Sequence, residues 1–195
     1  ELVPLVLNNP YNNKISGEEQ EKIRLFNSRA ELFETAYEWM HELLLTEEAN
    51  EVKDYLVNTR HYDSEVLKKS EFCYFPPAND IKDYLRKAHP EKEADINDLP
   101  LFGRTGDKYR LAIPYRNRKG EITGFIKRAT PSTVIIETDK YGKPSEVRYD
   151  STKGLNKEDI FNLCKCKDQE TLIIFEGYPD AGYFYAAGIE NATAV

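Results

Sequence analysis

Apolar side chains recur every three to four positions after residue 15, which is the spacing of an amphipathic helix. The sequence SGEE at residues 16–19 is a capping box, S-x-x-E, directly before this series. A long helix is therefore predicted from residue 16 to about residue 45. Its inward positions would be Ile23, Phe26, Ala30, Phe33, Tyr37, Met40 and Leu44.

Shorter stretches of the same kind predict three further helices, near residues 47–58, 63–70 and 81–88. Thr46 would cap the first of them, and Asn79 or Asp80 the last. Residues 1–15 lack periodicity and are predicted to be an irregular lead-in. We expect the charges of the helical half, residues 16–89, to form a solvated surface.

From about residue 109 the hydrophobic period changes to two, which is typical of strands. Residues 109–115 and 121–129 flank a turn at residues 116–120, where Gly120 favours a β-hairpin. Residues 132–138 and 144–150 flank a second turn containing Gly142. The sequence thus predicts two antiparallel hairpins within a β-rich part, residues 101–150.

The pattern changes again near the end of the chain. Residues 156–164 predict a short helix capped by Asn156, and the run TLIIF at residues 171–175 predicts a parallel strand covered on both faces. A helix over residues 180–188, ending at Gly188, and a strand over residues 191–195 complete a β-α-β unit. The fold class is therefore α+β, with a helical cluster, antiparallel hairpins and the start of a parallel α/β sheet.

Composition narrows the class of protein. The 195 residues are 40% hydrophobic, enough for one large domain or two small ones. No apolar run approaches the roughly 20 residues of a membrane span. The chain begins at Glu1 without a signal-peptide pattern and ends at Val195 inside an apolar run, so we expect a piece of a longer protein.

Three cysteines (Cys73, Cys164 and Cys166) indicate a reduced, cytoplasmic setting. The CKC pair has no CxxC or nearby histidine to complete a zinc site.

Charge is distributed unevenly along the chain. The formal net charge is −7, yet residues 101–153 carry 12 Lys/Arg and 6 Asp/Glu. Such a basic segment predicts a face that binds a polyanion, although an ordinary solvated sheet is the alternative. The candidates on the first hairpin are Arg110, Arg116, Arg118, Lys127 and Arg128.

Two carboxylates follow the predicted parallel strand, in the sequence FEGYPD at residues 175–180. Glu176 would lie at the carboxyl end of the strand, where ligands of open α/β sheets bind. Carboxylates at such positions hold Mg²⁺ or act as a base in phosphoryl chemistry. Asp180 has two interpretations, as a second functional carboxylate or as a helix cap.

Several stretches, in order, resemble the RNA polymerase core of DnaG-type bacterial and phage primases. LIIFEGYPDAGYFYAAGIENATAV is similar to the opening of the TOPRIM fold, an apolar strand followed by EGYxD. YRLAIPYRNRKGEITGFIKR resembles the family hairpin GRVMFPIRDxxGxVIGFGGR, and RYDSTKGLNKEDIFNL its KYLNSPET region. In the helical half, residues 27–76 resemble a family pattern containing YL..RGL. The resemblance covers roughly residues 20–195.

This resemblance implies RNA primer synthesis on a single-stranded DNA template, with ribonucleotides as substrates and a replicative helicase as partner. It implies that Glu176 and Asp180, the two carboxylates of EGYxD, are catalytic residues, and that Glu176 is a ligand of Mg²⁺ or Mn²⁺. Arg110, Arg116, Arg118, Lys127 and Arg128 fall on the basic hairpin, and Arg148 and Lys153 fall where the family keeps lysines that face template or nucleotide. Residues 16–155 would be the N-terminal subdomain of the core and residues 156–195 a partial TOPRIM (Rossmann-like) subdomain.

The sequence also departs from the family. Ile126 and Lys127 replace two glycines of GFGGR, and residues 133–147 look like an extended hairpin. The family's later acidic motifs would lie beyond Val195 and its zinc module before residue 1, so the piece is expected to be inactive by itself. Two alternatives stay open: a non-catalytic nucleic-acid-binding or helicase-loading module with a degenerate TOPRIM half, and a TOPRIM nuclease or topoisomerase relative.

Overall fold

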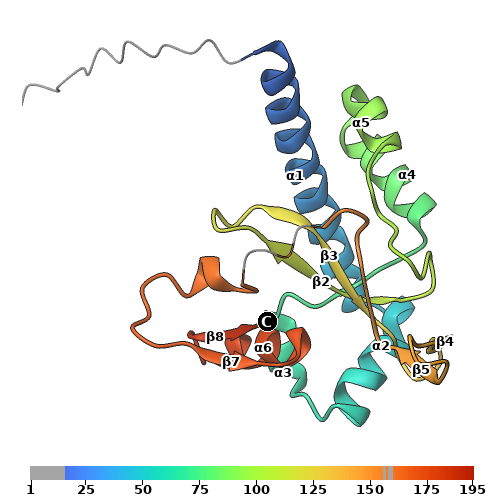
Figure 1. Ribbon diagram of the computed structural model, residues 1–195, viewed down its shortest axis with the longest axis vertical. Helices are drawn as coiled ribbons and strands as arrows, with labels where there is room; N and C mark the ends of the chain where they lie inside the picture. The colour runs from blue at the N-terminus through green and yellow to red at the C-terminus, as the bar shows by residue number, and fades with distance from the viewer. Residues whose placement is uncertain (1–15, 156, 158–159) are drawn as a thin grey trace, which may run out of the picture.

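A four-stranded antiparallel sheet with helices on both faces organises the molecule (Figure 1). The computed structural model describes residues 16–155, 157 and 160–195. The order of the strands in the sheet is β1-β2-β3-β6. Their bounds are Cys73–Tyr74 for β1, Leu111–Arg116 for β2, Ile122–Arg128 for β3 and Tyr149–Ser151 for β6.

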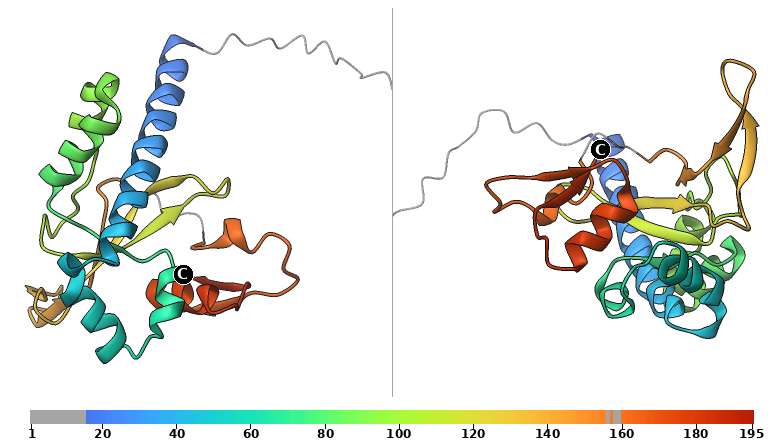
Figure 2. Two further views of the ribbon diagram at one scale, coloured as in Figure 1. Left: turned by 180° about the vertical axis from the view of Figure 1, so that it is seen from behind. Right: turned by 90° about the horizontal axis from the view of Figure 1, so that it is seen from below.

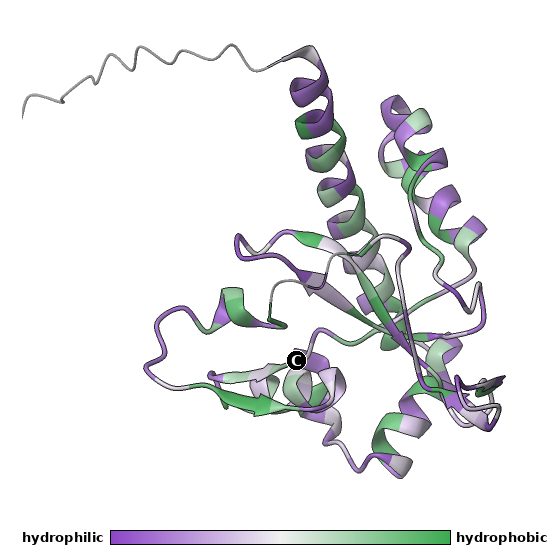
Figure 3. Cartoon of the chain, in the orientation of Figure 1, coloured by the Kyte–Doolittle hydropathy of each residue, from purple (hydrophilic) through white to green (hydrophobic). Residues whose placement is uncertain are grey.

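The predicted long helix is confirmed as α1 (Gly17–Leu44), together with its capping box. The Ser16 hydroxyl accepts from the Glu19 amide at 3.2 Å, and the Ser16 amide donates to the Glu19 carboxylate at 2.9 Å. The second half of α1 packs on β1 and β3, whereas its first turns extend past the sheet (Figures 1 and 3). Ile23 and Phe26 are therefore exposed, contrary to the predicted stripe.

The predicted helix near residues 47–58 is interrupted. It consists of a 3₁₀ turn (Glu47–Ala49), the short α2 (Asn50–Asp54) and a π-helical turn (Tyr55–Thr59). Thr46 does not cap it, because the Thr46 hydroxyl donates to the Leu43 carbonyl.

The helix predicted near residues 63–70 is confirmed as α3 (Ser64–Lys69), capped by Asp63. The α4 helix (Ala78–Ala88) begins after Pro77, so neither Asn79 nor Asp80 is its cap. A 3₁₀ turn (Pro90–Lys92) and α5 (Glu93–Asn97), which the pattern did not predict, then follow beside α4.

The first predicted hairpin is confirmed as β2 and β3. The Asn117 side chain accepts from the amides of Lys119 and Glu121, and Gly120 takes the left-handed φ of +90° that closes the turn. The hairpin is buried on both faces. Ala112 and Phe125 face the core beneath α1, α4 and α5, while Ile113 faces a second core shared with α3 and α6.

The second predicted hairpin is confirmed as β4 (Ile135–Thr138) and β5 (Pro144–Val147). Its second strand was expected to reach residue 150, but residues 149–151 belong to β6 and pair with β3. The β4–β5 hairpin forms a separate two-stranded sheet that projects from the body of the molecule (Figure 2).

The predicted β-α-β unit is confirmed as β7 (Ile173–Phe175), α6 (Tyr178–Ala186) and β8 (Ala192–Ala194). The strands β7 and β8 are parallel. The prediction that β7 is covered on both faces is wrong for the described chain, since Ile173 and Ile174 are 45% and 59% exposed. Figure 3 shows this strand as an apolar edge of the molecule.

The helix predicted over residues 156–164 falls partly outside the described residues, namely at positions 156, 158 and 159. Its described part is not an α-helix. Phe161 forms a β-bridge with Ala194, and a 3₁₀ turn (Leu163–Lys165) follows. Asn162 adopts a left-handed φ of +62°, which is incompatible with a continuous helix.

Within the described chain, no helix is both long enough and apolar enough to cross a membrane.

Candidate functional site

Residues 176–180, here called the acidic turn, comprise the link after β7 and the first residues of α6, and they lie against the main sheet. Gly177 precedes the helix, and a Cβ there would meet the Asp180 carboxylate at 3.0 Å and the Tyr149 hydroxyl of β6 at 3.7 Å. Tyr178 packs edge-on against the rings of Tyr115, Tyr149 and Phe161. A glycine and a buried aromatic cluster therefore fix the turn beside β2 and β6.

The Glu176 side chain is exposed directly after the last residue of β7. Among the residues that the structure describes, its carboxylate has no hydrogen-bond or ion-pair partner. The described residues also contain no group of three His, Cys, Asp or Glu side chains that could hold a metal ion. Glu176 can thus offer one oxygen ligand, but the described chain does not supply a complete metal site.

Asp180 lies in the first turn of α6, yet its side chain makes no capping hydrogen bond. Its carboxylate instead pairs with the Arg60 guanidinium and accepts from the Tyr62 hydroxyl at 2.6 Å. Burial and the hydrogen bond to Asp180 raise the pKa of Tyr62 above its ordinary value. The interpretation of Asp180 as a helix cap is wrong, because its carboxylate binds α6 to the helical half.

Tyr62 and Asp63 also hold α6 against the helical half, Tyr62 by ring packing and Asp63 by a hydrogen bond. The Tyr62 ring stacks on Tyr183 of α6, with centroids 4.1 Å apart, and the Tyr183 hydroxyl accepts from the Asp63 amide. Residues 60–63 therefore contact the acidic turn and α6 from the helical half. The prediction that charges of the helical half only form a solvated surface is wrong for Arg60.

Arg128, at the end of β3, lies over the ring of Tyr149 at 4.7 Å. Its Nε donates to the Tyr55 hydroxyl at 3.0 Å. No carboxylate within the described chain forms an ion pair with it. Because the Tyr149 hydroxyl lies next to Gly177, Arg128 brings an unneutralised cation to the neighbourhood of the acidic turn.

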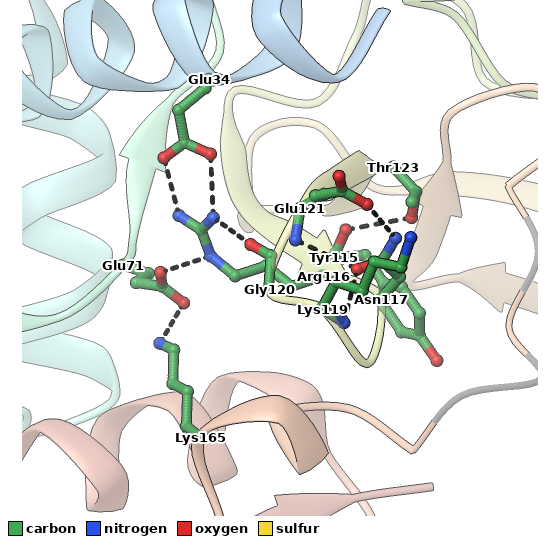
Figure 4. A network of polar contacts seen from close by, with 10 residues as sticks. All are labelled: Glu34, Glu71, Tyr115, Arg116, Asn117, Lys119, Gly120, Glu121, Thr123 and Lys165. Atoms are coloured by element: carbon green, nitrogen blue, oxygen red, sulfur yellow. Dashed lines mark hydrogen bonds and ion pairs between the residues drawn. The ribbon is translucent and has the colours of Figure 1, made fainter. Parts of the chain in front are cut away.

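Arg116 is committed to internal carboxylates, as Figure 4 shows. Its guanidinium binds Glu34 of α1 in bidentate fashion, at 2.8 and 3.0 Å, and its Nε donates to Glu71 at 2.9 Å. Glu71 also pairs with Lys165. Arg116 is mostly buried in this network, so the structure gives no support for the predicted contact with nucleic acid.

Lys127 is fully buried, which contradicts its predicted place on a basic surface. Its ammonium lies 3.5 Å from the Asp150 carboxylate and 5.1 Å from the Phe75 ring centroid. Burial lowers the pKa of Lys127, although the Asp150 charge acts in the opposite direction. The replacement of a family glycine by Lys127 thus serves the interior of the fold.

The other predicted cations do not form one continuous face. Arg110 and Arg118 lie at opposite ends of β2, and Arg110 pairs with Asp107 at 3.0 Å. Arg118 is exposed on the hairpin turn, and Arg148 is exposed and pairs with Glu146. Lys153 is exposed and lines a groove of about 510 Å³ with Arg29 of α1. Of the predicted cations, the structure brings Arg128 to the acidic turn.

Charge and motif reasoning did not select Arg60, Tyr62 and Tyr149 as site residues. The signal for Arg60 was the arginine of the YL..RGL pattern, although in YLVNTRHYD at residues 55–63 the arginine stands one position later than in the pattern. Tyr149 follows Arg148 in the stretch that resembles KYLNSPET. No local pattern points to Tyr62, since its role depends on Asp180, 118 positions away.

Solved structures share this fold, whereas no family model and no curated protein matches the sequence. The RNA polymerase domain of Mycobacterium tuberculosis primase DnaG, in complex with a double-stranded DNA oligomer with a 6-nucleotide overhang, matches with a TM-score of 0.61 and 23% identity. A DnaG primase catalytic domain bound to ssDNA matches with a TM-score of 0.63 and 20% identity. The Aquifex aeolicus primase (zinc-binding and RNA polymerase domains) matches with a TM-score of 0.58 and 26% identity.

These matches cover most of this chain but only part of each relative. They include 86%, 88% and 93% of this chain, and 54%, 54% and 43% of the respective solved chains. The chain therefore spans about half the length of the solved domains that it resembles. Over that length it has the α+β fold of the DnaG-type primase catalytic core.

Proposed function

We propose that this chain is part of a DNA primase, which joins ribonucleotides into a primer on a single-stranded DNA template. The observation that carries the proposal is the acidic turn on a DnaG-type fold. Among the described residues the Glu176 carboxylate has no partner, and the adjacent Gly177 lies by Tyr149 of β6, over which Arg128 is placed. Nucleotidyl transfer needs a carboxylate to bind a divalent metal ion and a cation to bind the phosphates, and the two groups lie in the same region of the fold here.

Each residue of the site has a proposed role. Glu176 is an oxygen ligand for Mg²⁺ or Mn²⁺, which would neutralise charge developing on the phosphates. The described residues contain no group of three such ligands, so water, substrate phosphates or other parts of the protein would complete the coordination. Arg128 contacts a template or nucleotide phosphate. Asp180 positions the turn through Arg60 and Tyr62.

Other parts of the proposal rest on resemblance. A boundary near residue 155 separates an N-terminal subdomain from a partial TOPRIM subdomain, and the protein acts in the cytoplasm with a replicative helicase. Arg110, Arg118, Arg148 and Lys153 remain proposed phosphate contacts, and we withdraw Arg116 and Lys127 because both are buried in ion pairs. Since the chain spans about half of a solved core, we expect the isolated chain to make no primers.

The test is template-dependent ribonucleotide incorporation by the protein that contains this chain together with the remainder of its catalytic core. Glu176→Gln removes the charge but keeps the shape, and we expect at least a hundredfold loss of primer yield. The control is Glu190→Gln, an exposed glutamate in the same β-α-β unit, which should leave the yield unchanged. Near-normal primer synthesis by the Glu176 variant would remove it from the catalytic site.

A second function is a non-catalytic nucleic-acid-binding or helicase-loading module. One observation favours it: the Asp180 carboxylate is already taken by Arg60 and Tyr62. The same assay separates the two functions, because a non-catalytic module would incorporate no ribonucleotide even with intact Glu176. The nuclease or topoisomerase alternative loses support, because the helices and hairpin before the acidic turn also match the primase core.

A further inference from the structure

The β4–β5 hairpin is a projecting arm that is fixed at its base. The buried Tyr109 hydroxyl donates to the Val147 carbonyl, and Val147 itself is buried. On β4, Glu137 pairs with Arg104 at 3.4 Å. The arm thus leaves the body of the molecule in a defined direction (Figure 2).

The tip of the arm, residues 139–143, is built as a tight turn. One carboxylate oxygen of Asp139 accepts from the amides of Tyr141 and Lys143, both at 2.8 Å. The Asp139 amide donates to the Lys143 carbonyl, also at 2.8 Å, and Gly142 adopts a φ of +77°. The Asp139 carboxylate is therefore hydrogen-bonded to the backbone of the turn, and this reduces its attraction for the ammonium groups of Lys140 and Lys143.

The side chains at the tip are one aromatic ring and two cations. Tyr141 is 74% exposed, more than any other large hydrophobic residue among those described. The Lys140 ammonium lies 5.0 Å from its ring centroid. Within the described chain Lys143 has no ion-pair partner. An exposed ring costs solvation free energy, which is recovered when another flat group covers it.

We propose that this tip binds single-stranded nucleic acid, with a base stacked on Tyr141 and backbone phosphates at Lys140 and Lys143. Proteins that bind single strands without sequence preference stack the bases on aromatic side chains and contact the phosphates with basic side chains. A protein partner would use the same ring, but the two flanking cations favour a polyanion. This binding site at the tip is separate from the acidic turn. The inference rests on the proposed function only because both sites would bind single-stranded nucleic acid.

The experiment measures binding of the full chain to an oligothymidylate that carries a fluorescent end label, at several salt concentrations. Tyr141→Ala is expected to weaken binding roughly 5- to 50-fold, because stacking on one ring is lost. Tyr141→Phe keeps the ring and should bind like the unaltered chain. The double variant Lys140→Ala/Lys143→Ala should reduce the slope of log K against log salt by about 1.4, which corresponds to two phosphates.

Two controls and a spectroscopic signal make the result specific. Lys87→Ala, an exposed lysine on α4, should change the slope by less than half as much as the double variant, and Arg128→Ala tests the acidic-turn site separately. A 2-aminopurine base in the strand should change fluorescence on binding to the unaltered chain and not to Tyr141→Ala. The substituted side chains lie outside both hydrophobic cores, so all variants should fold.

Unchanged affinity and unchanged 2-aminopurine signal in Tyr141→Ala would overturn the inference, and would leave a protein as the occupant of the tip. If Arg128→Ala weakened binding in that case, template binding at the proposed site would still stand. Absence of any binding by the unaltered chain would also overturn the inference. Primer synthesis by the complete protein decides the proposed function independently of either result.

Discussion

Gly103 occupies a position where a larger residue cannot fit. A Cβ there would lie 2.0 Å from the Ser151 carbonyl oxygen and 2.3 Å from a carboxylate oxygen of Asp150. Neither group can move away easily, because Ser151 pairs with β3 and Asp150 accepts from the amides of Arg104 and Thr105. The close approach lets the loop before β2 wrap around the Asp150 carboxylate.

Gly103→Ala should lower the free energy of unfolding by about 3 kcal/mol, because the added methyl forces the loop away from β6. The matched control is Gly182→Ala within α6, where a Cβ meets nothing within 4 Å. That change should be neutral or stabilise by about 0.5–1 kcal/mol, since alanine favours a helix. Urea unfolding followed by circular dichroism compares them, and equal stabilities would contradict the packing described.

At the scale of elements, a chain of charges joins three parts of the fold. Arg116 of β2 pairs with Glu34 of α1 and with Glu71, and Glu71 pairs with Lys165 in the segment before β7 (Figure 4). The Lys165 ammonium also lies 4.9 Å from the Tyr185 ring of α6. Glu71 thus links Arg116, and through it α1 and β2, to Lys165 in the segment before β7.

Glu71→Ala should destabilise the protein by about 1–3 kcal/mol, because two largely buried charge-assisted hydrogen bonds are lost. Protease cleavage should increase first in the C-terminal unit, which loses a partner for Lys165. Glu65→Ala on α3 is the control, since Glu65 is exposed and, within the described chain, its ion pair is with Lys68 one turn away. If the Glu71 and Lys165 alanine variants were additive in a double-mutant cycle, the two side chains would not be coupled.

The sequence predicts elements well where their determinants are local. The Ser16 capping box and the Gly120 and Gly142 turns act within a few residues and mark their elements correctly, whereas the caps expected at Thr46 and at Asn79 or Asp80 are wrong. Burial is harder, because it depends on distant partners. The run at residues 171–175 looks like a covered strand, but within the described chain only β8 pairs with it.

The site residues also fall into those that local sequence predicts and those that depend on distant partners. Glu176 and Asp180 follow from the strand and motif, and the aromatic Tyr178 between them is placed by the same turn. Lys127 could not be assigned correctly, since nothing near it in the sequence shows that Asp150 and two rings enclose its ammonium. A basic segment therefore overstates the basic surface whenever its cations are neutralised inside the fold.

At the scale of the whole molecule, Asp150 couples stability to pH. Its burial alone would raise the pKa, but hydrogen bonds from Thr105 and the charge of Lys127 outweigh burial and lower the pKa overall. A carboxyl group with a lowered pKa in the folded state stabilises the fold above its unfolded pKa of about 3.9. That contribution is lost as the pH falls through the folded pKa.

Asp150→Asn should therefore lower stability by about 1–3 kcal/mol at pH 7 and less as the medium is acidified. The unfolding free energies of the variant and the unaltered chain should converge as the pH falls below about 3.9 and through the lowered folded pKa. Asp168→Asn, an exposed aspartate, should follow the unaltered chain at every pH. A difference that stayed constant with pH would show that the charge of Asp150 does not contribute.

The bond between Arg60 and Asp180 also constrains the order in which the molecule can assemble. The two residues are 120 positions apart, so the contact closes one of the longest loops in the fold. Long loops are costly to close, and contacts of this kind form late. During synthesis, residues 60–63 leave the ribosome well before Asp180 does. We therefore expect the acidic turn to reach its final position only after the helical half, which supplies Arg60 and Tyr62, has formed.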